Sequence, residues 1–167
     1  MKTFCLTGMI ALVIIFWTNG AQAQNSETKL DQVQLMKQFI GTWVAESYDS
    51  SIMILDYKPF GDAIVGNAKV ISQDEDFDMK KYFLGYDGEN DKIIVAEIYY
   101  YTPIIDITAC WFISKNIMNS VPYQDISNPE NATMKWKFEF KSPDRFVITS
   151  FQNNTVTAVD EWIREKK

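Results

Sequence analysis

Met134-Lys135-Trp136-Lys137-Phe138-Glu139-Phe140-Lys141 alternates strictly between apolar and charged side chains. Successive side chains on a β-strand point to opposite faces, so a period of two places the four apolar residues on one buried face and the charged residues on a wet one. The stretch therefore predicts an antiparallel strand with one face against a hydrophobic core.

Short runs of similar composition fill the chain from Ile40 onward. They are rich in Val, Ile, Tyr, Phe and Trp and are separated by Gly, Asn, Asp and Pro. Turn residues such as Asp87-Gly88 and Asn153-Asn154 stand between successive runs, which favours pairing of consecutive strands as hairpins. The sequence predicts an all-β fold, an antiparallel up-and-down meander barrel of about 8 to 10 strands. The expected strands lie near 40–48, 51–57, 62–72, 79–86, 92–101, 104–115, 132–141, 145–152 and 155–164.

Two segments depart from this pattern. Residues 29–39 carry apolar side chains such as Leu30 and Val33 at helical spacing, which predicts a short N-terminal amphipathic helix. Residues 115–131 contain Pro122 and Pro129 and few periodic apolar residues. We expect one long connection there, of a length typical of lids and caps.

The N-terminus has the features of an export signal. Lys2 precedes an apolar stretch from Phe4 to Trp17, which is followed by the small-residue site Ala21-Gln22-Ala23. A membrane-spanning helix needs about 20 apolar residues, so cleavage after Ala23 is favoured over anchoring. The sequence predicts a signal peptide at 1–23, a single domain at 24–167, a secreted or periplasmic protein, and no integral membrane segment after cleavage.

The net charge argues against nucleic acid as a partner. The leader holds one of the 16 basic residues and none of the 22 acidic ones, so the mature chain has 15 basic residues and a net charge of −7. Nucleic acids and anionic membrane surfaces select basic patches. No nucleic-acid role is predicted.

The residue types present exclude several catalytic systems. The chain has no histidine, which excludes Ser-His-Asp and Cys-His nucleophiles and histidine-based zinc sites. Cys110 is the one cysteine left after cleavage, and its apolar run indicates a buried thiol. The acidic segment 74–78 is interpreted as a solvated loop rather than a calcium site. No catalytic residue, metal ligand set or cofactor is predicted.

Two carboxylates and several aromatic residues are the candidate ligand contacts. Glu97 and Asp106 each interrupt an apolar strand, where a carboxylate needs a hydrogen-bond donor. The simpler interpretation is that each points to solvent or pairs with a lysine. Barrels of about eight strands either fill with side chains or hold one small ligand, and the sequence leaves both open. The lumen candidates are Glu97, Tyr99, Trp111, Trp136 and Phe138.

Motifs at both ends of the chain resemble those of lipocalin-like barrels of the calycin superfamily, in particular uncharacterised secreted bacterial families. The motifs are Gly41-Thr42-Trp43, Gly85-Tyr86-Asp87 and the C-terminal Arg164. The resemblance implies that Arg164 on the last strand lies over Trp43 at the closed end, with Gly41 allowing a close approach of the helix. The similar haem-binding nitrobindin-like barrels hold iron through a histidine, which this chain lacks.

Three functions remain as hypotheses. The sequence favours a non-enzymatic protein that binds a small hydrophobic or amphipathic ligand in its barrel. The first alternative is a structural or interaction module whose outer face at 93–101 contacts another chain. The second is a histidine-free isomerase or cyclase that uses tyrosines with Glu97 and Asp106.

Overall fold

Ten strands, one short α-helix and three 3₁₀ turns are the regular elements of the described part of the protein. The computed structural model describes residues 29–46, 51–72 and 76–166. Its elements, in chain order, are α1 (Gln32–Met36), the 3₁₀ turn η1 (Lys37–Phe39), β1 (Gly41–Glu46), β2 (Ile52–Phe60), β3 (Ala63–Ile71), β4 (Asp76–Asp87), β5 (Lys92–Tyr99), β6 (Ile105–Ser114), β7 (Ile117–Pro122), η2 (Tyr123–Asp125), η3 (Pro129–Asn131), β8 (Met134–Ser142), β9 (Arg145–Gln152) and β10 (Thr155–Arg164).

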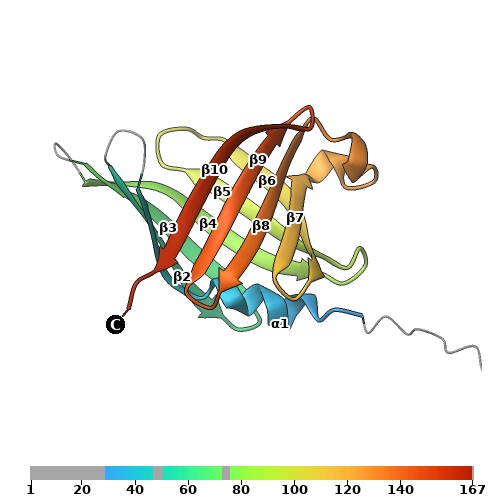
Figure 1. Cartoon of the computed structure of the whole chain (residues 1–167), viewed down its shortest axis with the longest axis horizontal. Coiled ribbons are helices and arrows are strands. Elements are labelled where there is room, and N and C mark those ends of the chain that lie inside the picture. Colours follow the sequence, from blue (N-terminus) through green and yellow to red (C-terminus); the bar gives the residue numbers. More distant parts are fainter. Residues whose placement is uncertain (1–28, 47–50, 73–75, 167) are drawn as a thin grey trace, which may run out of the picture.

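The strands form a closed antiparallel barrel in which each strand pairs with its neighbours in sequence, and β10 returns to β1 (Figure 1). The predicted all-β meander barrel with a short N-terminal helix is confirmed. Closure is narrow, because β1 and β10 are in register only at Trp43 with Arg164 and at Val44 with Ile163. Ala45 and Glu46 have no partner on β10, so the strands diverge on that side, whereas on the other side the Glu165 amide donates to the Thr42 carbonyl.

The alternation in β8 places its apolar side chains inside the barrel. Phe138 and Phe140 lie opposite Ile148 and Phe146 of β9, and Trp136 lies opposite Ser150. Aromatic rings fill the end of the barrel next to the helix: Phe146 is 4.6 Å from Trp43 and 6.0 Å from Trp162, measured between ring centroids. This aromatic cluster belongs to the hydrophobic core of the barrel.

The short helix closes that end of the barrel (Figure 1). Asp31 caps α1 by accepting a hydrogen bond from the Gln34 amide. The buried Gln32 side chain bonds both the amide and the carbonyl of Phe112 on β6. Phe39 of η1 points into the barrel and is 4% exposed, so the helix end acts as a plug.

The segment 115–131 differs from the expectation of one long connection, because β7 forms within it. Met118 and Ser120 face inward, opposite Phe112 and Cys110 of β6. Ser120 is polar although it faces inward, and Pro122 ends the strand, so the sequence of β7 lacks a clear alternation of apolar and polar residues. For this reason nine strands were expected, whereas ten form. The remaining connection holds η2 and η3 at the end of the barrel opposite α1 (Figure 1).

The expected signal peptide at 1–23 lies outside the described residues. Within the described ranges no helix is both long enough and apolar enough to span a membrane.

Candidate functional site

The interior of the barrel holds a cavity of about 260 Å³. Its floor is formed by Phe39, Phe146 and Trp162, and its walls are mainly apolar. Ligand pockets usually have volumes of roughly 300 to 1,000 Å³, so this cavity lies just below that range and has room only for a small molecule. The other lining residues are Met53, Leu55, Tyr57, Ala68, Met79, Lys80, Tyr82, Leu84, Ile93, Val95, Thr108, Cys110, Met118, Ser120, Trp136, Phe138, Ile148, Ser150 and Asp160.

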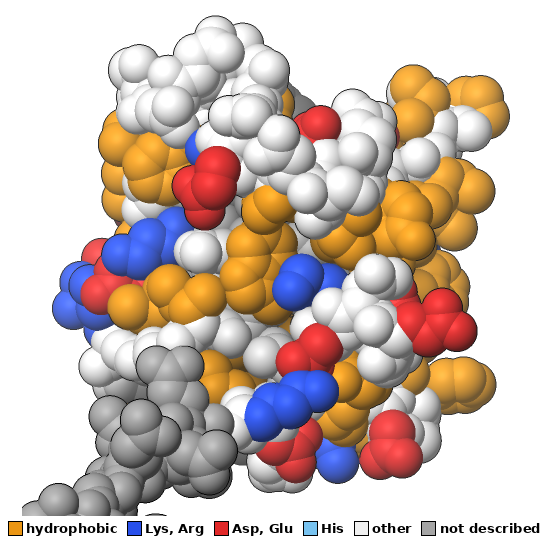
Figure 2. Space-filling view, turned by 90° about the vertical axis from the view of Figure 1, so that its right-hand side faces the viewer, with side chains coloured by type: hydrophobic (Ala, Val, Ile, Leu, Met, Phe, Trp, Pro, Cys, Tyr) orange, Lys and Arg blue, Asp and Glu red, His pale blue; other side chains and the backbone are white. Residues whose placement is uncertain are grey.

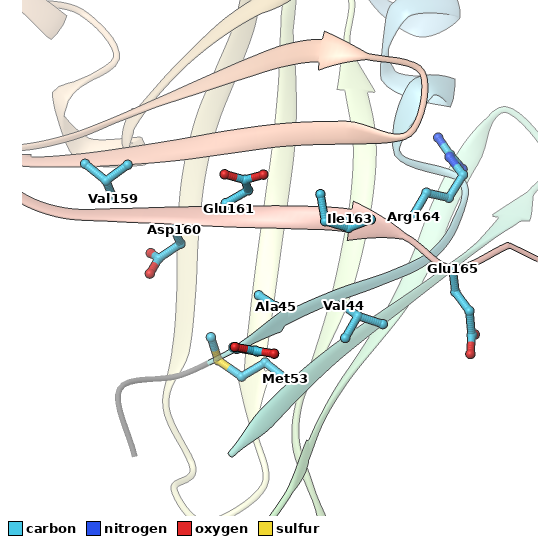
Figure 3. Close-up of a pocket in the computed structure, with 10 residues that line it drawn as sticks. Val44, Ala45, Met53, Val159, Asp160, Glu161, Ile163, Arg164 and Glu165 are labelled. Carbon is cyan, nitrogen blue, oxygen red and sulfur yellow. The ribbon is translucent and has the colours of Figure 1, made fainter. Parts of the chain in front are cut away.

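A wider groove of about 680 Å³ lies where β1 and β10 diverge (Figure 3). It is larger than the interior cavity but open to solvent, so it would desolvate a ligand less well. Met53 and Asp160 line both hollows. The groove therefore adjoins the cavity at these two side chains.

An ion pair lies on the inner face of β4 and β5. Lys80 Nζ is 2.5 Å from Glu97 Oε2, and the two side chains are only 16% and 19% exposed. The same ammonium lies 5.0 Å from the Tyr82 ring centroid and 5.1 Å from that of Tyr99. The Tyr99 hydroxyl also donates to Glu97, at 3.4 Å. Lys80 is therefore held by a carboxylate and two aromatic faces.

Two tyrosine hydroxyls in the cavity are without partners. Tyr57 and Tyr82 lie with ring centroids 5.5 Å apart, and within the described residues neither hydroxyl forms a hydrogen bond. Burial raises the pKa of both phenols well above 10, with a further contribution from the negative charge of Glu97. Both hydroxyls stay protonated near neutral pH and are able to donate to an oxygen of a ligand.

Cys110 is a structural thiol rather than a nucleophile. It is 2% exposed and donates to Ser120 Oγ at 3.1 Å. Burial raises the pKa of Cys110 to about 11, although its hydrogen bonds with Ser120 and Thr108 oppose this. At neutral pH almost no thiolate forms, so covalent chemistry at this residue is disfavoured.

The residues expected in the lumen divide between two faces of the barrel. Trp136 and Phe138 line the cavity. Glu97 and Tyr99 lie next to it, in contact with Lys80. Trp111 does not reach the cavity, and its expected place in the lumen is wrong.

Trp111 lies on the outer face of β6. It pairs with Asn119, whereas its neighbours Cys110 and Phe112 point inward. Its ring packs under Lys92 Nζ at 4.8 Å and lines a separate hollow beneath η3. In an apolar run such as 109–113 both faces are hydrophobic, so composition does not show which residues face the lumen.

Asp106 lies opposite Glu97 in the β5–β6 register but is exposed. Asp76 and Asp78, from the acidic segment, bind Lys69 and Asn67. Residues 74 and 75 lie outside the described residues. In the described part of the chain no three Cys, Asp or Glu side chains come together in a way that would hold a metal ion.

Lys80 and Asp160 are lining residues that the sequence reasoning missed. Near Lys80 the register between β3 and β4 shifts at Ala68, leaving Met79 as an extra residue. Both Met79 and Lys80 then line the cavity, which strict alternation does not predict. Asp160 lies two residues before the inward-facing Trp162 on β10, and this spacing could have predicted that Asp160 also faces the cavity.

Comparison of the chain with protein-family models, with curated proteins and with solved structures finds no match. The interior cavity is therefore the main basis for a functional proposal.

Proposed function

We propose that this protein is a lipocalin-like carrier of the calycin type that binds a small hydrophobic or amphipathic molecule in its barrel. The observation that carries the proposal is the interior cavity of about 260 Å³, with apolar walls and a few convergent polar groups. The free hydroxyls of Tyr57 and Tyr82 would orient the ligand by donating to its oxygen atoms.

The environment of the Trp162 side chain supports the proposal that a ligand occupies the cavity. Trp162 lines the cavity and is 5% exposed, yet its indole Nε1 has no hydrogen-bond acceptor among the residues that the structure describes. A buried donor without a partner costs about 1 to 3 kcal/mol. An oxygen-bearing ligand, after a small adjustment of the ring, would supply the missing acceptor.

Export is part of the proposal. The leader at 1–23 would direct the chain across a membrane, and the mature barrel would act in the periplasm or outside the cell. The net charge of −6 for the whole chain agrees with a role away from nucleic acid.

The test combines detection of a ligand with a blocked cavity. Native mass spectrometry of the protein isolated from its own host should show one bound small molecule, and calorimetry should show binding of 1-octanol or 3-phenyl-1-propanol. Ser150→Phe places a ring in the cavity and should abolish binding. Thr149→Phe, one residue earlier in the same strand, has a side chain that is not among those lining the cavity and should leave binding intact. Equal binding by both variants would refute a site in the lumen.

An interaction module is a second candidate because large apolar side chains cluster around the β5–β6 connection. Six of them are exposed: Ile98, Tyr100, Tyr101, Ile104, Ile105 and Ile107. Hydrophobic side chains also gather along one margin of the face in Figure 2. Such patches often mark interaction sites. If this surface pairs two copies, sedimentation should show a dimer that Tyr100→Ser with Ile104→Ser converts to monomer; a wild-type monomer would exclude self-pairing.

The enzymatic hypothesis is less well supported. Glu97, its main candidate acid, is bound to Lys80 at 2.5 Å. That pairing favours a carboxylate that anchors a neighbour over one that transfers a proton.

A further inference from the structure

We propose that the ligand of the cavity is a small organic ammonium compound, an apolar molecule whose cationic group pairs with Asp160. The inference rests on the proposed ligand-binding function and specifies the chemistry of the ligand. It begins from the charged groups of the cavity wall. Among the described lining residues these are two, Lys80 and Asp160.

Lys80 is not available to an anionic ligand. Its ammonium is bound to Glu97 and packed against the rings of Tyr82 and Tyr99. A ligand carboxylate would have to compete with Glu97 at a site that already holds a matching negative charge.

Asp160, in contrast, is available to a cation. Its carboxylate forms no ion pair or hydrogen bond with another described residue. Asp160 lies in one cross-strand row with Ile148 and Phe138, so its immediate wall is apolar. A carboxylate at an apolar wall gains most from a partner that brings a positive charge.

The groove that leads to Asp160 is lined by acidic side chains. The groove between β1 and β10 is lined by Glu46, Glu161 and Glu165 as well as Asp160 (Figure 3). Among the described residues that line the groove, Arg164 is the one basic residue. In Figure 3 Asp160 and Glu161 point to opposite sides of β10, as consecutive strand residues do.

The positive charge of Arg164 is already engaged. Its guanidinium donates to the carbonyls of Ile40, Gln38 and Pro143 and stacks on Trp43. Glu161 pairs with Arg145, whereas neither Glu46 nor Glu165 forms a side-chain ion pair or hydrogen bond with any described residue. The groove therefore has a negative field that concentrates cations next to Asp160.

The cavity walls also suit a cation. Its lining includes four rings from the β8 to β10 side, namely Trp136, Phe138, Phe146 and Trp162. The face of an aromatic ring attracts an ammonium group, and the attraction increases when water is excluded. An anionic group would gain nothing from these faces.

The test uses matched compounds that share one apolar skeleton. The probes are octylamine, octanoate and 1-octanol, with 3-phenylpropylamine, 3-phenylpropionate and 3-phenyl-1-propanol as a second series, each titrated into the full chain by calorimetry at neutral pH. The amine should bind about tenfold more tightly than the alcohol of its series, the effect of one charge-assisted hydrogen bond. The carboxylate should bind more weakly than the alcohol.

Asp160→Asn keeps the shape of the side chain and removes its charge. This variant should lose the roughly tenfold preference for the amine over the alcohol of its series, measured within the variant itself. Glu89→Gln, in the exposed β4–β5 turn, changes the net charge equally and should leave the amine preference intact.

The outcomes separate the two proposals. If the alcohols bind but the amines show no advantage, or if Asp160→Asn keeps that advantage, the ammonium assignment is wrong and the carrier proposal survives. If no amine or alcohol binds, both are overturned. The comparison in the unmodified chain stands even if a variant does not fold.

Discussion

The guanidinium carbon of Arg164 lies 4.0 Å from the centroid of the Trp43 ring. Its three nitrogens also donate to backbone carbonyls of Ile40, Gln38 and Pro143. One side chain on the last strand thus ties together the first strand, the helix end and the β8–β9 turn. A guanidinium is suited to this role because its donors are spread in a plane that also stacks on an indole.

Arg164→Lys should destabilise the barrel although it keeps the charge. An ammonium group cannot satisfy the three separate carbonyls and stack at the same time, so the free energy of unfolding should fall by about 2 to 3 kcal/mol. Urea unfolding followed by tryptophan fluorescence measures this. Arg145→Lys affects an exposed pair with Glu161 and should cost less than about 1 kcal/mol. Equal losses in the two variants would contradict a special role for Arg164.

Gly41→Ala should disturb the same closure. Gly41 has φ +131°, and a Cβ there would overlap Nη1 of Arg164. Backbone strain of this kind costs on the order of 1 to 3 kcal/mol, before any displacement of the arginine. Gly85→Ala is the matched control, because a Cβ there meets no atom of the described residues within 4 Å. Thermal unfolding should rank Gly41→Ala well below wild type and Gly85→Ala near it; the reverse order would refute this reading.

Removing one partner of the Lys80–Glu97 pair should cost more than removing both. Lys80→Met leaves a carboxylate that is only 19% exposed next to apolar walls, with an expected loss of about 2 kcal/mol or more. Adding Glu97→Gln to Lys80→Met should restore part of that stability, because the uncompensated charge is gone. A double-mutant cycle in urea measures the coupling. Additive losses would show that the two side chains act independently.

Stability should fall as pH rises above 9, with Cys110 as one cause. Burial raises the pKa of this thiol from 9.0 to about 11. Between these values the unfolded chain releases a proton that the folded chain keeps, so unfolding becomes easier by up to about 3 kcal/mol. Cys110→Ala should lack this first loss and decline only at higher pH, as unfolding releases the phenol protons of Tyr57 and Tyr82. Urea midpoints at several pH values compare the two chains; superimposable pH profiles would exclude a contribution from the thiol.

The sequence predicted the barrel well because its alternation and its turns agree. The expected strands 145–152 and 155–164 coincide with β9 and β10, where Asn153 and Asn154 adopt positive φ in the turn. The helix at 29–39 is shorter, since only Gln32–Met36 is α-helical and Lys37–Phe39 tightens into a 3₁₀ turn. The alternation of apolar and polar residues did not predict β7, because one of its inward-facing residues is a serine.

The site was harder to predict because its chemistry depends on register. Lys80 enters the cavity at a bulge, and a bulge leaves no mark in composition. The position of Asp160 on an apolar part of the cavity wall, beside the divergence of β1 from β10, depends on strand pairing and could not be predicted from the sequence. Trp111 and Trp136 look alike in sequence, and the pairing of their strands alone assigns one to the outside and the other to the inside.

The pairing of β1 with β10 at only two positions determines where the barrel opens locally. Every other pair of neighbouring strands is held over at least four positions, so local opening should begin at this seam and leave the remaining sheet intact. Slow amide exchange would then persist in β3 and β4 while Val44 and Ile163 exchange early. If β1 and β10 separate, the space for a ligand extends from the cavity into the groove between them. The barrel can then bind a ligand that is longer than the closed cavity.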